Sequence, residues 1–206
     1  MVIELKEAGR RFNQEWIFRN INYTFQSGGK YAILGPNGSG KSTLLSVILG
    51  NLSPSEGSIR YIDGQEILPE QIYRHLSFAA PYLDLIEEFT LAETLQFHFK
   101  FKGLKNGMSL AQVRDRLGLA RAQDKALKYF SSGMKQRTKL ILACCADTPM
   151  LLLDEPTSNL DVQGIEWYQD LIADYTKDRL VVVGSNQEAE YGFCDYLLQI
   201  TNYKTS

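Results

Sequence analysis

The segment between residues 35 and 43 has the residue types and the spacing that bind phosphate. It reads GPNGSGKST and matches the pattern G-x-x-x-x-G-K-[ST], between an apolar run at Tyr31–Leu34 and a helix-forming run at Leu44–Leu49. Glycines let the backbone wrap so that its N–H groups point at phosphate oxygens, and a helix beginning near Lys41 adds its positive end. The predicted nucleotide-binding residues are Gly35, Pro36, Asn37, Gly38, Ser39, Gly40, Lys41, Ser42 and Thr43.

Two side chains of this loop and two carboxylates further along the chain could carry the chemistry. Lys41 is expected to reach the β- and γ-phosphates of ATP, and the hydroxyl of Ser42 to ligand Mg²⁺. The apolar run Met150–Leu153 ends in Asp154 and Glu155. We expect Asp154 to hold Mg²⁺ through water and Glu155 to polarise the attacking water as a general base. The alternative is an ordinary acidic turn at the end of a strand.

A second potential anion site lies at Phe130–Arg137, which reads FSSGMKQR and leads into the helical run KLILACCA. A hydroxyl and free N–H groups at a helix N-terminus attract anions. Taken alone, this segment is also compatible with a plain helix N-cap. The loop Ser158–Asp161 follows the acidic strand end, and Asp161 is expected to cap a helix that begins near Val162.

A buried sheet would position these residues. The runs at 150–154 and 180–184 are continuously apolar, which is typical of strands covered on both faces. Apolar spacing predicts a helix within Gln163–Lys177. The full set of predicted strands lies near Val2–Leu5, Ile21–Phe25, Tyr31–Leu34, Ser58–Ile62, Leu76–Ala79, Met150–Asp154, Leu180–Gly184 and Tyr196–Ile200.

Between about Leu91 and Lys128 the strand pattern is replaced by a helical one. The sequences LAETLQFHFKFKG and SLAQVRDRLGL predict two helices, joined by a turn-prone stretch at Gly103–Ser109. We therefore expect one α/β domain over residues 1–206, with a small helical subdomain inserted at approximately 84–130.

The segment at 130–137 resembles the signature sequence of ABC ATPases, usually written L-S-G-G-Q-x-Q-R. Ser131, Gly133, Gln136 and Arg137 match it, and Phe130, Ser132 and Met134 depart from it. The resemblance covers nearly the whole chain and implies a P-loop NTPase (RecA-like) core. To this core the family adds an N-terminal antiparallel β subdomain and a small inserted helical subdomain.

The resemblance also implies how the sites act. In this family two subunits pair head to tail around two ATP·Mg²⁺, so that each signature closes on the nucleotide of the other subunit. Ser131, Ser132, Gly133 and Met134 would then contact ATP in trans, and Ser158 and Asp161 would form the D-loop. The cycle of closing and reopening would drive a separate transmembrane permease, for which Ala79–Glu88 and the helical subdomain are the expected contact surface.

An aromatic residue before the phosphate loop stacks on adenine in such proteins. Phe12 occupies that place in this chain, and Trp16 is the alternative. A core aromatic without a ligand is the remaining interpretation of either residue.

Two residues that the family uses are absent from their expected places. A Gln linking the magnesium site to the helical subdomain is expected near Ala79–Pro81, where the sequence reads SFAAPYLDL. A switch His is expected after the strand at 180–184, where Asn186 stands instead. An amide can hydrogen-bond a phosphate oxygen but cannot carry the charge of an imidazolium. With Glu155 retained, we therefore expect hydrolysis that is present but slow.

Composition sets the remaining expectations. The formal charge of −2 gives no global attraction to nucleic acid, so no nucleic-acid partner is expected. No run has the length of a signal peptide or of a membrane span, which predicts a cytoplasmic subunit that is peripheral to the membrane through its permease. The three cysteines are expected to be reduced and buried. The partner ATPase could be a second copy or a different chain.

Other functions fit parts of the pattern. An ATP-binding regulatory subunit would tolerate the altered switch position. A soluble, non-transport ABC ATPase acting on DNA or ribosomes would share the nucleotide site, although such proteins typically carry long insertions or two cassettes. A P-loop kinase is disfavoured by the segments at 130–137 and 158–161.

Overall fold

The computed structural model describes residues 1–204, which form two sheets and the helices between and beside them. The N-terminal sheet is antiparallel, with strand order β2-β1-β4-β5. Its strands are β1 (Val2–Phe12), β2 (Glu15–Phe25), β4 (Glu56–Asp63) and β5 (Gln65–Ile67).

The second sheet is parallel at every pairing and has the order β6-β7-β8-β3-β9. Neighbouring parallel strands end at the same edge of a sheet, so residues that follow β3, β6, β7 and β8 meet there. The strands are β3 (Lys30–Leu34), β6 (Leu76–Ala79), β7 (Met150–Asp154), β8 (Leu180–Gly184) and β9 (Tyr196–Gln199).

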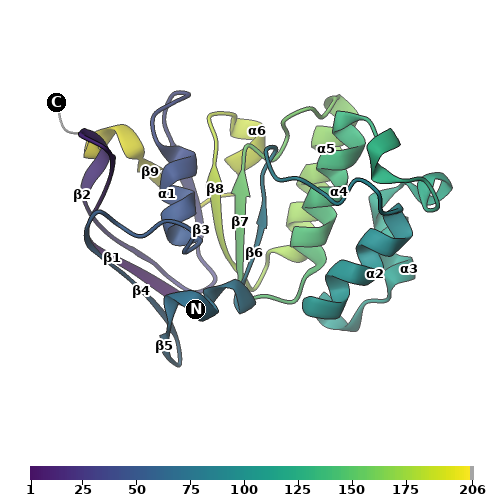
Figure 1. Ribbon diagram of the computed structural model, residues 1–206, viewed down its shortest axis with the longest axis horizontal. Helices are drawn as coiled ribbons and strands as arrows, with labels where there is room; N and C mark the ends of the chain where they lie inside the picture. Colours follow the sequence, from purple (N-terminus) through teal and green to yellow (C-terminus); the bar gives the residue numbers. More distant parts are fainter. Residues whose placement is uncertain (205–206) are drawn as a thin grey trace.

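The helices lie in layers around the parallel sheet (Figure 1). Helix α1 (Lys41–Ile48) lies between the two sheets, whereas α4 (Ser132–Cys145) and α5 (Val162–Tyr175) cover the opposite face of the parallel sheet. Helices α2 (Leu91–Phe101) and α3 (Leu110–Leu117) lie beyond α4, and the short α6 (Glu188–Tyr191) follows β8. The 3-10 turns are η1 (Pro69–Arg74), η2 (Lys105–Gly107), η3 (Ala120–Ala122), η4 (Leu127–Tyr129) and η5 (Ile200–Tyr203).

Two hydrophobic cores hold these layers together. One joins the antiparallel sheet to α1 and to one face of the parallel sheet, and the other joins the opposite face to the helices α2 to α5. Strands β7 and β8 are buried along their whole length, as their continuous apolar sequences predict. The central strands are therefore fixed from both sides, and their carboxyl ends are rigid supports for a site.

The helices of the inserted region begin and end at recognisable signals. Thr90 and Glu93 form a capping box at the start of α2, and Ser109 and Gln112 form one at the start of α3. Gly118 ends α3 in the left-handed conformation, with φ of 70°. Both helices lie within the stretch that the sequence predicts to be helical.

The N-terminal sheet is longer than its sequence predicts. Strand β1 continues to Phe12 and β2 begins at Glu15, and β5 has no counterpart among the predicted strands. Register shifts between Leu5 and Arg11 interrupt the alternation of buried and exposed residues on which strand prediction depends. No helix among the described residues is long and apolar enough to cross a membrane.

The three cysteines are free thiols. Cys144 and Cys145 end α4 and are fully buried, and Cys194 is partly buried. Burial raises the pKa of each thiol to about 12. Arg179, which is 1% exposed, donates hydrogen bonds to the carbonyl oxygen of Cys144 at 2.8 Å and to the hydroxyl of Thr148 at 2.5 Å. It thereby ties the end of α4 to the segment that leads into β7.

Candidate nucleotide site

The phosphate loop, residues 35–43, connects β3 to α1 through three left-handed glycines. The φ angles of Gly35, Gly38 and Gly40 are 154°, 74° and 107°. A Cβ at Gly35 would lie 2.6 Å from Oγ of Ser39, and one at Gly40 would lie 2.5 Å from Ile17. Only glycine fits at these two positions, because the backbone is both left-handed and crowded there. The loop is thus held tightly between β2 and the C-terminal segment near Ile200.

Lys41 lies folded back over this loop. It is 4% exposed, and its Nζ donates to the carbonyl oxygens of Gly35 at 2.8 Å and Pro36 at 3.4 Å. The Oγ atom of Ser39 is buried in the same loop without a hydrogen-bond partner. A buried polar atom without a partner is rare and marks a place where a ligand or water supplies the missing bond. The loop therefore has polar groups that a phosphate would satisfy.

Asp154, at the end of β7, is 1% exposed. Its Oδ2 accepts a hydrogen bond from the hydroxyl of Tyr82 at 3.0 Å, whereas its Oδ1 is buried and has no partner. Burial raises the pKa of Asp154, and the hydroxyl groups of Ser42 and Tyr82 oppose that rise. A cation beside the carboxylate would favour its ionised form. Ser42 and Asp154 therefore fit a magnesium ion in both donor type and position.

The remaining ligands of such an ion would come from the nucleotide and from water. Over residues 1–204 no three His, Cys, Asp or Glu side chains gather as a metal cage. Magnesium commonly binds through one or two protein oxygens together with substrate phosphates. A site with oxygen ligands from Ser42 and Asp154 would match this common coordination of magnesium.

Tyr82 is a site residue that the sequence analysis missed. It follows the place of the missing Gln, on the loop between β6 and α2. Burial and the charge of Asp154 both raise the pKa of its phenol, so Tyr82 remains a neutral O–H donor. A polar aromatic beside Pro81 was the available signal. Its partner lies 72 positions away, and sequence spacing could not reveal that contact.

Glu155 follows Asp154 in a strained backbone conformation. Its φ is 41°, in the left-handed region that side chains rarely adopt. Its N–H donates to the carbonyl oxygen of Gly184 at 2.9 Å, which anchors the turn to β8. The carboxylate is half-buried. Glu155 therefore lies in the turn after β7, at the edge of the sheet that also carries the phosphate loop after β3.

Asn186, in the expected switch position, contacts the phosphate loop directly. Its Oδ1 accepts from the N–H of Gly35 at 3.3 Å, and its Nδ2 donates to Oδ1 of Asn37 at 3.2 Å. The side chain is exposed and neutral. Asn186 thus lies within hydrogen-bonding reach of the loop, with one N–H donor that can turn toward a phosphate.

Glu190 is a second residue that sequence reasoning missed. Its carboxylate is fully buried and accepts from the N–H and the hydroxyl of Thr157, at 2.8 and 2.5 Å, and from the hydroxyl of Ser185. Thr157 lies two residues after Glu155, and Ser185 directly precedes Asn186. Glu190 therefore binds together the two loops that carry the candidate base and the switch residue.

The signature residues line a separate cavity. Ser131 caps α4 by accepting from the N–H of Met134 at 3.2 Å, and Asp161 caps α5 by accepting from the N–H of Gly164 at 2.8 Å. A cavity of about 310 Å³, the signature pocket, is lined by Ser131, Ser132, Gly133, Met134, Arg137, Asn159, Leu160 and Asp161. None of its lining residues belongs to the phosphate loop. Ser158, the other D-loop residue, is half-buried and directly precedes Asn159 in the sequence.

Gln136 and Arg137 have structural contacts. Nε2 of Gln136, which is 1% exposed, donates to the carbonyl oxygen of Pro156 at 2.8 Å. The guanidinium of Arg137 lies over the ring of Trp167, 4.5 Å from its centroid. Gln136 thus fixes α4 to the loop after β7, and Arg137 fixes it to α5. Gly133 packs so closely that a Cβ would lie 2.9 Å from the carbonyl oxygen of Asn159.

The two candidate adenine aromatics differ in what already covers them. Trp16 is half-buried, with Arg19 4.7 Å and Arg11 5.5 Å from its ring centroid. Phe12 is 45% exposed and has Arg10 at 4.7 Å from its ring centroid. Phe12 therefore has more free ring surface for a base. It lies at the turn between β1 and β2, and β2 contacts the head of α1 through Ile17.

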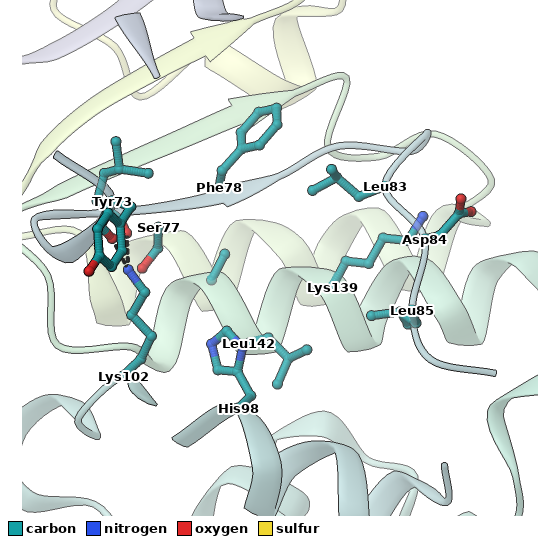
Figure 2. A pocket seen from close by; sticks show the side chains of 12 residues that line it. Tyr73, Ser77, Phe78, Leu83, Asp84, Leu85, His98, Lys102, Lys139 and Leu142 are labelled. Atoms are coloured by element: carbon teal, nitrogen blue, oxygen red, sulfur yellow. Dashed lines mark hydrogen bonds between the residues drawn. The ribbon is translucent and has the colours of Figure 1, made fainter. Parts of the chain in front are cut away.

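A cavity of about 350 Å³ lies beside the loop that follows β6 (Figure 2). It is bounded by β6, by the loop at 83–85, and by residues of α2 and α4. Lys139 and Leu142 of α4 project toward it, with Lys102 and His98 on another side (Figure 2). Nζ of Lys102 donates to the carbonyl oxygen of Leu76 at 2.7 Å, and Nζ of Lys139 donates to that of Pro81 at 2.5 Å. This cavity shares the loop that carries Tyr82.

The fold and the loop at residues 35–43 define a P-loop protein, with a separate cavity at the N-terminus of α4. The family model described as ABC transporter matches residues 18–158. The chain belongs to this family.

Relatives with curated descriptions agree with this membership. The chain is 28% identical over 209 residues to the "Uncharacterized ABC transporter ATP-binding protein YybJ" of Bacillus subtilis (strain 168), covering 98% of this chain and 93% of that protein. It is 31% identical over 179 residues to the "Fe(3+) ions import ATP-binding protein FbpC" of Escherichia coli (strain K12). That match covers 85% of this chain and 51% of FbpC.

Among solved structures, the chain is similar to a cassette whose title reads "Dimeric Structure of MJ0796, a Bacterial ABC Transporter Cassette". The TM-score is 0.79 at 26% identity, with 97% of this chain and 95% of that chain covered. The same cassette has been solved in a post-hydrolysis state bound to ADP and Pi, with the same TM-score and identity. The predicted fold class is thereby confirmed: a P-loop core with an antiparallel sheet and added helices.

Proposed function

We propose that this chain is the ATP-binding and ATP-hydrolysing subunit of an ABC transporter, acting at the cytoplasmic face of a membrane through a separate permease. The observation that carries the proposal is the separation of the two anion sites. The signature pocket at the head of α4 has no lining residue in common with the phosphate loop at the head of α1. A second subunit, either a copy or a different chain, would complete each site, as the dimeric relative supports.

In this proposal the chain's own groups bind and orient ATP. The N–H groups of the phosphate loop bind the phosphate oxygens, and Lys41 exchanges the carbonyl of Gly35 for the β- and γ-phosphates. Ser42 and Asp154 hold the metal. Magnesium, when bound, neutralises charge on the β- and γ-phosphates. Glu155 polarises the attacking water, and Asn186 turns its N–H toward a γ-phosphate oxygen.

The neutral Asn186 supports slow turnover. Loss of one charge-stabilising contact in a transition state typically costs about 10²–10³ in rate. The Oδ1 atom of Asn186 also already accepts a hydrogen bond from the N–H of Gly35 in the loop itself. A second candidate function follows from the same observation: an ATP-binding regulatory subunit that hydrolyses little. A turnover assay run beside a nucleotide-binding assay separates the two, because only the regulatory subunit would bind ATP without measurable phosphate release.

The test of the main proposal is Glu155→Gln. This substitution removes the base and keeps the size of the side chain, so we expect turnover to be abolished and an ATP-bound dimer to accumulate. Analytical ultracentrifugation with and without ATP·Mg²⁺ measures the dimer, and phosphate release measures turnover. Glu188→Gln, an exposed carboxylate on α6, is the matched control. Hydrolysis at the wild-type rate in Glu155→Gln would exclude Glu155 as the base.

The permease contact surface is proposed at Ala79–Glu88 and the helical subdomain. In support, Tyr82 and Ile86 on that loop are 54% and 46% exposed, and Phe97 and Phe101 on α2 are 46% and 75% exposed. The loop also borders the cavity of Figure 2. With the permease present, Asp84→Lys should reduce permease-stimulated ATP hydrolysis, whereas Asp170→Lys on the exposed face of α5 should not. Equal stimulation in both variants would count against this surface.

A further inference from the structure

The loop after β6 brings a phenol to the metal site, at the place where the family supplies an amide. Residues 79–88 contain no Gln. Instead, the hydroxyl of Tyr82 donates to Oδ2 of Asp154 at 3.0 Å. Tyr82 is 54% exposed, so the bond lies where the buried carboxylate meets solvent.

The two oxygens of Asp154 have different surroundings. Oδ2 has the Tyr82 hydroxyl, and Oδ1 is buried without any partner. Oδ1 lies on the side of α1, because a Cβ built at Gly184 would be 3.0 Å from it and 2.7 Å from Leu45 of that helix. The hydroxyl of Ser42, in the first turn of the same helix, lies close enough to lower the pKa of the same carboxylate. The oxygen without a partner thus belongs to the side of the carboxylate where Ser42 would hold the metal.

The backbone that carries Tyr82 is held from behind by α4. Nζ of Lys139 donates to the carbonyl oxygen of Pro81 at 2.5 Å, and Lys135 forms an ion pair with Glu87. The Tyr82 ring also packs near Phe78, with centroids 6.4 Å apart. Because Tyr82 is fixed at both ends of its loop, its hydroxyl can orient Asp154.

We propose that Tyr82 is a positioning residue for the metal: its hydroxyl holds Oδ2 of Asp154 and thereby presents Oδ1 toward Ser42 and the ion that accompanies ATP. A neutral O–H supplies this bond without adding charge beside the metal. Partners that orient a ligating carboxylate strongly affect metal affinity. The inference rests on the proposed function, because it assumes that ATP and its metal bind at the phosphate loop.

The test measures metal binding rather than activity. Mn²⁺ serves as the probe, and its free fraction is followed by electron paramagnetic resonance with the full chain and a non-hydrolysable ATP analogue. Tyr82→Phe removes only the hydroxyl and should weaken Mn²⁺ binding about 10-fold. Nucleotide affinity in EDTA should not change. Tyr196→Phe, another half-exposed tyrosine on β9, is the matched control and should bind Mn²⁺ within about twofold of wild type.

A double-mutant cycle separates positioning from a general effect. In an Asp154→Asn background, Tyr82→Phe should change Mn²⁺ affinity by less than about twofold, because the group it orients is gone. Full additivity of the two substitutions would overturn the inference, as would wild-type Mn²⁺ affinity in Tyr82→Phe. If wild-type protein bound the nucleotide with no dependence on metal, the proposed metal site itself would fail, whatever Tyr82 does. The two failures are therefore distinguishable.

Discussion

The phosphate loop and the signature pocket are both built at helix N-termini, yet they differ in how far they are prepared for an anion. In the phosphate loop, Lys41 and Ser39 are 4% and 1% exposed, and Oγ of Ser39 has no partner. In the signature pocket, Ser131 and Ser132 are exposed, and the hydroxyl of Ser131 already caps its own helix. A phosphate gains more binding free energy from buried polar groups that lack partners than from groups that water already solvates. We therefore expect the first site to bind ATP alone and the second to contribute only when another surface covers it.

The largest expected effect comes from restoring a histidine at the switch position beside the phosphate loop. Asn186→His introduces a side chain that can carry charge at a position that already touches Gly35. We expect phosphate release to rise by about 100-fold, the usual size of one such transition-state contact. Asn186→Gln, which stays neutral, should show no rise. Unchanged turnover in the His variant, with normal ATP binding, would contradict the proposal that the neutral Asn186 limits hydrolysis.

A paired substitution tests the comparison itself. For the isolated subunit, Lys41→Ala should lower ATP affinity about 10- to 100-fold, because it removes a charge-assisted hydrogen bond from a buried site. Ser131→Ala should leave that affinity unchanged and instead weaken ATP-dependent dimerisation. Equilibrium binding of a fluorescent ATP analogue and sedimentation measure the two properties. Equal losses of ATP affinity in both isolated variants would break the comparison.

The hydrogen bonds of Glu190, which join the loop after β7 to the loop after β8, should contribute measurably to the stability of the fold. Glu190→Gln weakens three hydrogen bonds to a buried carboxylate. We expect the free energy of unfolding to fall by about 2 kcal/mol, in urea denaturation followed by circular dichroism. Glu188→Gln is exposed and should change it by less than about 0.5 kcal/mol. A Glu190→Gln protein as stable as wild type would show that these hydrogen bonds are dispensable.

The smallest expected effect concerns adenine. Phe12→Ala should reduce ATP affinity by about 1 kcal/mol, or about fivefold, since the ring is partly exposed and one face is near Arg10. Trp16→Ala should have less effect on ATP affinity, because Arg11 and Arg19 already lie over its ring. The same binding assay with GTP in place of ATP tests whether the contact reads the base. A larger loss for Trp16→Ala would reverse the assignment.

The sequence predicts the elements around the candidate site that are local in the chain. The order strand, glycine loop and helix at 31–49 is visible in spacing alone, and so are the two carboxylates after a buried strand. The contacts of Tyr82, Glu190 and Gln136 were not predictable in this way. Each joins segments far apart, at separations of 72, 33 and 20 residues, so no periodicity reports them.

The fold shows the same division. Buried strands with continuous apolar sequence, such as β7 and β8, appear where the sequence predicts them. Strand β5 is only three residues long and mostly exposed. In β1, the register shifts interrupt the alternation of buried and exposed residues. Pairing with β4 holds both, so tertiary contacts rather than local propensity decide these strands.

The low reactivity of the native cysteines has a practical consequence for observing the two sites. With pKa values raised to about 12, the three native thiols are almost wholly protonated at neutral pH and react slowly with alkylating reagents. A cysteine substituted for the exposed Ser132 would by contrast be accessible to a maleimide dye. A single label could then be placed at the rim of the signature pocket without first removing any native cysteine, and its emission would report when another surface covers that rim.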